Sequence, residues 1–412
     1  MHINLFYRIM RANIILILLC ILCAPLLASA QYFDLNPGYK KKIIPFRLVR
    51  NMIIIQLKLN DKGPFNFILD TGVGLMIITD PDLVDSINLQ SKHIIKIPGL
   101  GDGDDAEAYI TSQINVQIPG LISHDVNAAI LKKDHFNLSN YAGMPIDGLL
   151  GYEFFNSLAV KINFGDSTIV VCRPKDLHPF RKSSKIVLRI EQQKPYLQAL
   201  ITYPNGSCKN SKLVIDLGAG HPLLLENMIK NNGLPKQSIP ANLGVGLNGP
   251  IDGYISRISE IQLAKYTVNN VLTSFPLNQS LQTPSIPRDG NIGIGLLKKF
   301  TLIFDYTDSV LYLKPNQDFK ESFEHDMSGL EYYAANDYKH IIISRVEPGS
   351  AGDVIGLEKG DEIISINLTP VEKMSLEEID NILKSKDGRG ILLEIFHDNK
   401  YDNVILTLKR RI

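Results

Sequence analysis

The sequence lacks several features that mark particular classes of protein. It has no tryptophan and only four cysteines among 412 residues. Its 43 basic and 43 acidic side chains cancel at pH 7, so we do not expect a large nucleic-acid-binding surface. None of the nine histidines stands in a spacing typical of a zinc site, and we expect neither a metal nor another cofactor. With 45% hydrophobic and 21% charged residues, the composition is globular and excludes a disordered or collagen-like chain.

Long hydrophobic runs are scarce as well, and the one near the start is short. Residues 14–24 are apolar, Arg8 and Arg11 precede them, and an Ala-Ser-Ala triplet follows that ends at Ala30. This combination is typical of a secretory signal peptide. The run is too short to span ~30 Å of hydrocarbon, and no second run of ~20 apolar residues follows. We therefore expect residues 1–30 to be removed on export, which makes the mature protein periplasmic or extracellular, with membrane contact only through this segment before cleavage.

Two of the four cysteines fall inside this segment, so the mature chain keeps Cys172 and Cys208. In an oxidising compartment the two thiols could form a disulfide. Two free thiols fit the spacing equally well, and the sequence leaves the pairing open.

The rest of the chain repeats itself. One apolar strand runs into the Asp-Thr-Gly of residues 70–72, and another runs into the Asp-Leu-Gly of residues 216–218. Further along, Asp147 opens the block Asp-Gly-Leu-Leu-Gly, and Asp289 opens Asp-Gly-Asn-Ile-Gly. The matching blocks lie about 145 residues apart in both cases, a common offset that chance rarely produces. The sequence therefore predicts two homologous halves.

Two glycine-rich stretches lie between these blocks. Residues 99–103 lead to Tyr109, and residues 244–249 lead to Tyr254. Alternating apolar positions around them predict hairpins with glycine turns. The second stretch also matches the dinucleotide-binding pattern G-x-G-x-x-G, but Pro250 follows it and no amphipathic helix begins there. We therefore exclude a dinucleotide site.

Many short strands with glycine turns and few helical periods indicate a mostly β fold. We expect one β-barrel lobe over residues 31–180 and a homologous lobe over residues 181–316. A polar linker, residues 316–326, leads into a third unit over residues 317–412. That unit combines short strands with a helix that a capping box opens at residues 375–378, which indicates a small α+β domain.

On the Asp-Thr-Gly, Asp-Leu-Gly and apolar-Gly blocks, the two halves resemble a two-lobed, single-chain aspartyl protease of the pepsin/retropepsin type. The resemblance implies a catalytic dyad of Asp70 and Asp216, with Thr71, Gly72 and Gly218 supporting the two turns. In such a dyad the ionised carboxylate activates a water toward a peptide carbonyl, and the protonated one donates to the carbonyl oxygen. Because one chain carries both motifs, no homodimer is required.

The same resemblance makes the glycine-rich hairpins flaps over the cleft. Tyr109 and Tyr254 would then contact substrate, although cross-strand packing explains both tyrosines equally well. We interpret Asp147 and Asp289 as structural turn residues. His221 follows the second motif closely and could approach the site, but we favour a solvent-facing or capping histidine.

One residue departs from the family's pattern. Leu217 stands where the family has Thr or Ser, so it lacks the hydroxyl that would bond across the lobes. The function we expect is an exported aspartic endopeptidase that acts on a peptide or protein substrate. The alternative is a catalytically inactive pseudo-protease that serves as a peptide-binding adaptor.

Residues 326–412 resemble a PDZ domain of the bacterial, circularly permuted kind. The resemblance rests on Pro-Gly-Ser-Ala-Gly at residues 348–352 and Gly-Leu-Glu-Lys-Gly-Asp at residues 356–361. It implies a domain that binds peptide or protein C-termini as an added strand, with a ligand that the sequence does not identify. Together with the two lobes, it resembles the architecture of bacterial exported aspartyl proteases. The expected carboxylate-binding loop comprises Met327, Ser328, Gly329 and Leu330.

Overall fold

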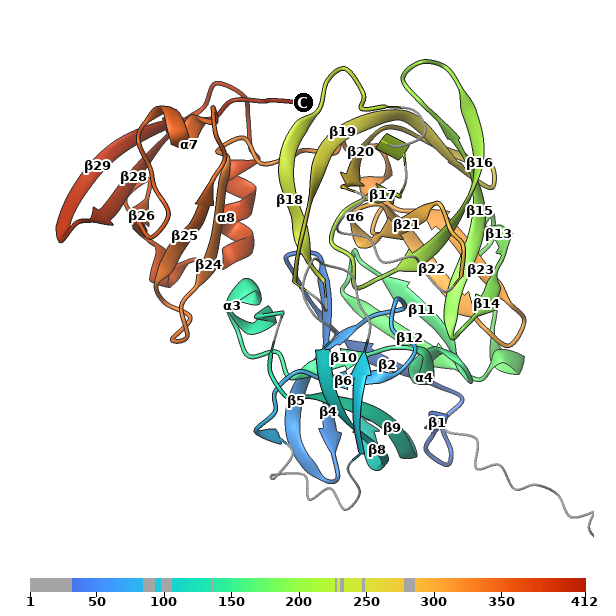
Figure 1. Cartoon of the computed structure of the whole chain (residues 1–412). Coiled ribbons are helices and arrows are strands. Elements are labelled where there is room, and N and C mark those ends of the chain that lie inside the picture. Colours follow the sequence, from blue (N-terminus) through green and yellow to red (C-terminus); the bar gives the residue numbers. More distant parts are fainter. Residues whose placement is uncertain are drawn as a thin grey trace, which may run out of the picture. The chain divides into compact units, whose positions relative to one another are not determined.

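Strands make up most of the chain, and short turns join them (Figure 1). The computed structural model describes residues 32–83, 93–97, 106–134, 136–226, 228–229, 233–246, 249–277 and 286–412. The signal peptide expected over residues 1–30 and the first glycine-rich stretch lie outside these ranges. Within them, no helix is long and apolar enough to cross a bilayer.

The first lobe is built on a sheet in which nine strands fall within the described residues. Burial alternates along the second half of one of them, Met52–Leu59, as it does in a strand with one face on a core. Two strands that are far apart in the sheet order given next, Leu121–Leu131 and Ala106–Ile118, also pair with each other. This pairing curls the sheet back on itself. The order is β1 (Asp34–Leu35), β9 (Leu121–Leu131), β6 (Met76–Ile78), β10 (Gly148–Leu150), β5 (Lys62–Leu69), β4 (Met52–Leu59), β8 (Ala106–Ile118) and β7 (His93–Ile97), with β3 (Arg47–Val49) beside β4.

The second lobe repeats this arrangement with eight strands in the described residues. Their order is β14 (Arg189–Glu191), β15 (Lys194–Thr202), β16 (Cys208–Asp216), β21 (Gly290–Gly293), β17 (Leu223–Leu225), β20 (Tyr266–Pro276), β19 (Gly249–Leu263) and β18 (Ile239–Gly246). β21 runs parallel to β16 and antiparallel to β17, as β10 does with β5 and β6. The same order and the same directions confirm the duplication that the sequence predicted. β18 and β19 pair as the two arms of the expected hairpin as far as Gly246 and Gly249, and residues 247–248 lie outside the described residues.

A third sheet joins the two lobes, and no pattern in the sequence predicted it. Its order is β13 (Ser184–Val187), β23 (Val310–Pro315), β22 (Phe300–Asp305), β11 (Ala159–Asn163), β12 (Thr168–Cys172) and β2 (Lys41–Pro45). β11 of the first half pairs with β22 of the second, with Val160 opposite Phe304. These are the matching strands of the two repeats, so each half completes a sheet that it cannot build alone.

The C-terminal domain has its own sheet and its own core. The sheet order is β24 (Leu330–Ala334), β25 (Ile341–Val346), β26 (Glu362–Ile366), β28 (Gly390–His397) and β29 (Lys400–Thr407), with β27 (Thr369–Pro370) beside β26. α7 (Ala351–Val354) and α8 (Leu376–Leu383) complete it. The predicted capping box at the start of α8 is present, since Ser375 and Glu378 bond each other's backbone N–H.

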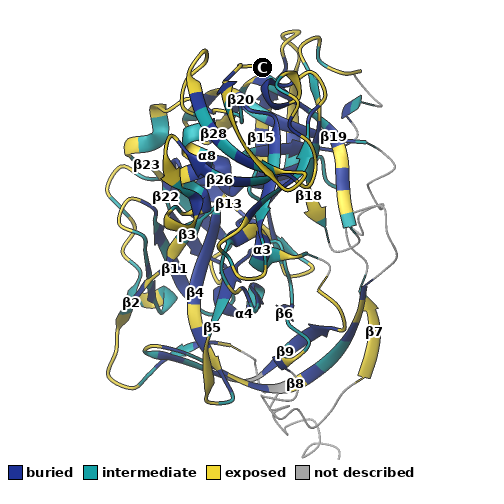
Figure 2. Ribbon diagram, turned by 90° about the vertical axis from the view of Figure 1, so that its left-hand side faces the viewer, coloured by how far each residue is buried: buried dark blue, intermediate teal, exposed yellow. Residues whose placement is uncertain are grey.

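The C-terminal domain and the joined lobes have separate hydrophobic clusters, and Figure 2 shows buried residues along their strands. In the described residues, the larger cluster of the lobes runs through both of them, a smaller cluster lies in the first lobe alone, and the C-terminal domain has its own. Cys172 and Cys208 are both free. Other short helices among the described residues are α3 (Leu138–Ala142), α4 (Tyr152–Phe155), α6 (Ile294–Leu297), η1 (Pro174–Asp176), η3 (Gln317–Lys320) and η4 (Val371–Lys373).

Candidate active site

Two aspartates stand at equivalent turns of the two lobes. Asp70 follows β5 directly, and Asp216 is the last residue of β16. A short parallel strand supports each turn, because β10 pairs with β5 and β21 pairs with β16. The backbone N–H of Asp70 donates to the carbonyl oxygen of Leu150 in β10 at 2.9 Å. Strand pairing thus sets where each carboxyl group leaves its strand.

The two turns meet across the boundary of the lobes, and their glycines show how closely. A Cβ built on Gly72 would lie 2.7 Å from Oδ1 of Asp216, and one built on Gly218 would collide with the carboxyl group of Asp70. Each carboxyl group therefore rests against the glycine of the opposite motif, where a larger residue would displace it. The structure brings these four residues, all named from the sequence, into one site.

Thr71 connects the two turns through its hydroxyl group. Its Oγ1 donates to the carbonyl oxygen of Ile215 at 2.7 Å and accepts from the N–H of Leu217 at 3.0 Å. Thr71 and Leu217 occupy matching positions of the two motifs, and both side chains are buried. Leu217 has no hydroxyl group, so it makes no equivalent hydrogen bond to the first lobe. The cross-lobe connection therefore comes from one lobe, and it uses the backbone of the other.

The two carboxyl groups receive different numbers of hydrogen bonds. Oδ1 of Asp70 accepts from the N–H of Gly72 at 2.6 Å. Oδ1 of Asp216 accepts from the N–H groups of Gly218 at 3.0 Å and Ala219 at 3.1 Å. Its Oδ2 accepts a further bond from Nδ2 of Asn291 at 3.3 Å. Hydrogen bonds to a carboxylate favour its charged form, so this pattern places the negative charge of the pair on Asp216.

Asn291 in turn is held by His221, at 2.6 Å between the amide oxygen and Nε2. The amide oxygen can only accept, so Nε2 carries the proton. Burial lowers the pKa of His221, which keeps the ring neutral. The solvent-facing or capping histidine that we favoured is therefore not what the structure shows, because the half-buried ring of His221 bonds Asn291 and lines the cavity beside the second turn.

The repeat contains a signal for Asn291 and His221, which were not among the site residues expected from the sequence. Asn291 occupies the position that Leu149 has in the first lobe, and His221 the position of Leu75. Two apolar residues of one half are thus polar in the other. A polar replacement beside a repeated Asp-x-Gly motif marks a difference between the two carboxyl groups.

Asp70 is buried, and this burial raises its pKa to about 8. The negative charge of Asp216 and a hydrogen bond with it act in the same direction, against the N–H of Gly72 and the positive charge of Lys194. Asp70 is therefore the protonated member at neutral pH. The electrostatics and the hydrogen-bond pattern assign the two roles in the same way.

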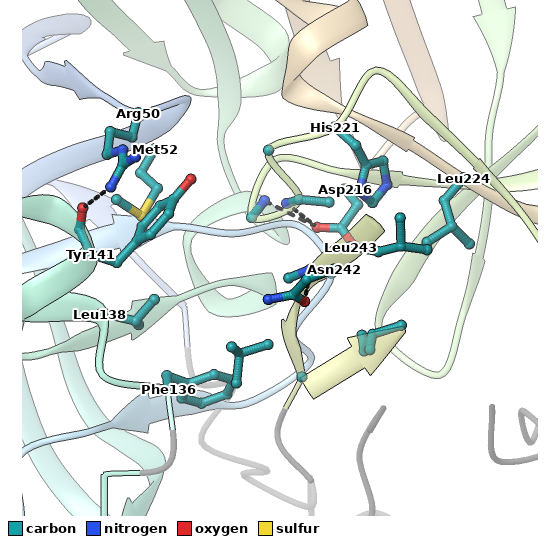
Figure 3. Close-up of a pocket in the computed structure, with 18 of the residues that line it drawn as sticks. Arg50, Met52, Phe136, Leu138, Tyr141, Asp216, His221, Leu224, Asn242 and Leu243 are labelled. Atoms are coloured by element: carbon teal, nitrogen blue, oxygen red, sulfur yellow. Dashed lines mark hydrogen bonds between the residues drawn. The ribbon is translucent and has the colours of Figure 1, made fainter. Parts of the chain in front are cut away.

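A cavity of about 1250 Å³ opens beside this pair. Figure 3 shows Asp216 and His221 on one side of it and Arg50 on the other. The C-terminal domain contributes to the same cavity, which the sequence did not indicate. Its apolar lining includes Met52, Ile68, Ile77 and Leu149 from the first lobe, Val214, Leu224, Ile251 and Ile255 from the second, and Leu330 from the C-terminal domain.

The two flap tyrosines lie elsewhere. Tyr109 in β8 and Tyr254 in β19 pack against the larger hydrophobic cluster. Neither is among the described residues that line the cavity, so cross-strand packing accounts for their positions. From the second glycine-rich hairpin, Leu243, Gly244 and Val245 line the cavity instead.

Asp147 and Asp289 hold the strands that lead to the two motifs. Oδ2 of Asp147 accepts from the N–H of Asn66 at 2.6 Å, and Oδ2 of Asp289 from the N–H of Lys212 at 2.8 Å. These bonds agree with the structural role expected for both. In the described part of the chain, no group of three or more His, Cys, Asp or Glu side chains is arranged to hold a metal ion.

Comparison with known families gives a match in the first lobe and another in the C-terminal domain. The family model described as aspartyl protease matches residues 55–154, and the PDZ domain model matches residues 318–395. No curated protein matches the sequence. The chain therefore has an aspartyl protease domain, whose match covers the first motif, and a C-terminal PDZ domain.

Proposed function

We propose that this chain, with its aspartyl protease and PDZ domains, is an exported aspartic endopeptidase. The observation that carries the proposal is the packing of each aspartate on the glycine of the opposite motif. It supports a complete dyad within one chain. Export is supported by the charged, apolar and small-residue pattern of residues 1–30.

In the proposed reaction Asp216 is the general base and Asp70 the general acid. The carboxylate of Asp216 removes a proton from a water molecule, whose oxygen attacks the carbonyl carbon of the peptide bond. Asp70 gives its proton to the carbonyl oxygen, which prevents a full negative charge there. The tetrahedral diol then breaks its C–N bond: the nitrogen takes the proton that Asp216 received, and one hydroxyl of the diol returns a proton to Asp70 as it becomes the new carbonyl.

The cavity supports an extended peptide as substrate. Its walls are mostly apolar on both sides of the dyad, so side chains that flank the cleaved bond would leave water for apolar surroundings. His221 and Asn291 act as positioning residues, because they hold Oδ2 of the proposed base.

The test is cleavage of a diverse peptide library between pH 4 and 7. Asp70→Asn and Asp216→Asn are the informative variants. Asp398→Asn is the matched control, because Asp398 lies on an exposed turn of the PDZ domain with a side chain 87% exposed. We expect cleavage by the unaltered chain and the control, and none by the two dyad variants.

Two other outcomes would favour a different site or a different function. If only Asp70→Asn loses activity, the second lobe is not half of the site. If a folded chain cleaves nothing, the inactive adaptor becomes the better hypothesis, and the missing hydroxyl at Leu217 becomes its explanation. Leu217→Thr would then be the variant to assay for regained cleavage.

A further inference from the structure

The PDZ domain has one sheet edge that faces the aspartyl protease domain. Among the described strands, β24 pairs only with β25, so its other edge is open to pairing. α8 lies alongside, since the hydroxyl of Tyr332 in β24 donates to Asp380 in α8. PDZ domains take extended peptides on an exposed sheet edge. We call the space between these two elements the β24–α8 groove.

Arg50 of the aspartyl protease domain fills this groove. Its Nε and Nη2 donate to the two carboxylate oxygens of Asp380 at 3.1 and 3.0 Å. Its Nη1 donates to the carbonyl oxygens of Tyr332 at 3.3 Å and Tyr141 at 3.0 Å. The guanidinium carbon lies 4.9 Å and 4.3 Å from the ring centres of the same two tyrosines. Only 9% of the Arg50 side chain is exposed.

These partners suit a guanidinium group more closely than any other side chain. A paired contact to one carboxylate needs two N–H groups in a planar fork, which arginine has and lysine lacks. Flat aromatic faces suit the same planar cation. The edge of β24 is engaged further along as well, because Nδ2 of Asn140 donates to the carbonyl oxygen of Ala334 at 2.9 Å.

The loop expected to bind a terminal carboxylate already has an internal one. Oδ1 of Asp326 accepts from the N–H groups of Ser328 at 3.0 Å and Gly329 at 2.6 Å. The N–H of Leu330 donates to the hydroxyl of Ser328 at 3.1 Å. These N–H groups therefore already have hydrogen-bond partners within the loop. The charged group of the β24–α8 groove that binds Arg50 is the carboxylate of Asp380.

The turn that carries Arg50 also contacts the catalytic loop of the second lobe. Arg50 and Asn51 join β3 to β4 with φ angles of 46° and 63°. Nδ2 of Asn51 donates to the carbonyl oxygen of Gly220 at 2.9 Å, and Oδ1 of Asn51 accepts from Nζ of Lys298 at 2.9 Å. Gly220 directly precedes His221. One two-residue turn thus connects the β24–α8 groove to the residues that hold Asp216.

We propose that the β24–α8 groove is an arginine-recognition site that Arg50 occupies in cis, and that an extended peptide bearing an arginine binds by displacing it. Displacement moves the turn and releases Asn51 from Gly220, which loosens the loop of Asp216. The binding part stands without any peptidase activity. The effect on cleavage rests on the proposed function.

Binding is tested by calorimetry on the full chain with Nα-acetylarginine N-methylamide. Its citrulline analogue is the control ligand, because it has nearly the same shape without the charge. Arg50→Ala opens the site, Arg50→Lys is the more conservative second variant, and Arg47→Ala is the matched control at an exposed position of β3. We expect the arginine ligand to bind Arg50→Ala at least tenfold more tightly than the unaltered chain or Arg47→Ala. The added change Asp380→Asn removes that gain.

Equal binding to Arg50→Ala and to the unaltered chain overturns the proposal, as does equal binding of the citrulline ligand. Coupling is read from hydrogen exchange at the N–H groups of Gly218 and Ala219, which donate to Asp216. Their exchange should rise several-fold in Arg50→Ala, and also in the unaltered chain when the arginine ligand saturates the groove and displaces Arg50. Unchanged exchange refutes the coupling. If the unaltered chain cleaves no peptide, the proposed function is refuted, but the calorimetric binding and the hydrogen exchange still decide this proposal.

Discussion

Replacing Asp70 by asparagine tests how the proposed dyad of Asp70 and Asp216 is charged. Burial raises the pKa of Asp70 to about 8 in the folded chain, whereas an aspartate in an unfolded chain titrates near ~3.9. Between these values the folded state holds a proton that the unfolded state has released. Stability therefore falls as pH rises through this window, by about 1.4 kcal/mol per pH unit from this one group. Over the whole window the cost is on the order of 5 kcal/mol.

Asparagine has the shape of the protonated carboxyl group and cannot ionise, so Asp70→Asn should remove this slope. At pH 4 the variant and the unaltered chain should unfold at nearly the same urea concentration. At pH 8 the variant should be more stable by several kcal/mol, on the order of the cost given above. The measurement is urea unfolding followed by circular dichroism at pH 4, 6 and 8.

The companion variant Asp216→Asn should behave differently. Its amide group loses charge-assisted bonds from Gly218, Ala219 and Asn291, so no comparable gain is expected at pH 8. Parallel pH profiles for Asp70→Asn and the unaltered chain would refute the assignment of the proton to Asp70. A larger gain at pH 8 in Asp216→Asn would show that the two roles are reversed.

Further predictions concern the rest of the site. Cleavage measured as kcat/KM should fall as pH rises through about 8, because Asp70 then loses the proton it donates; a rise would contradict that role. Asn291→Leu removes the hydrogen bond to Asp216, the proposed base, so it should lower kcat by roughly 10–100-fold with little change in KM in steady-state assays. An unchanged kcat would show that this hydrogen bond does not contribute to catalysis. Thr71→Val leaves two buried backbone groups unpaired and should destabilise the chain by about 1–3 kcal/mol per group in urea unfolding; an unchanged midpoint would mean that the groups find other partners. Gly218→Ala should abolish cleavage while circular dichroism stays unchanged, because the methyl group meets the opposing carboxyl group, and retained activity would contradict the packing described.

Local patterns in the sequence were sufficient for the halves of the site. Strand, turn and glycine follow one another within a few residues in each motif, and duplication repeats the pattern. The capping box of α8 is equally local, since it involves residues three apart. Such features are encoded by neighbouring residues, so a single sequence predicts them.

The second half of the candidate site was predicted only in part. The repeat located Asp216 and Gly218, but it gave no direction for the ring of His221. That direction depends on Asn291, which is distant in sequence and reaches the ring through the pairing of β16 with β21. The sheet shared by the two lobes was missed for the same reason, because β11 and β22 are equivalent strands of different halves.

The sequence by itself determined the duplication, the two aspartate turns and the type of the C-terminal domain. The tertiary structure alone decided which carboxyl group holds the proton, because that depends on donors gathered from separate strands. It also decided that Arg50 fills the β24–α8 groove, through a contact to Asp380 that spans 330 residues of sequence. Short-range patterns specify turns and strands, whereas burial, charge and the partners of a side chain are set only when distant segments pack together.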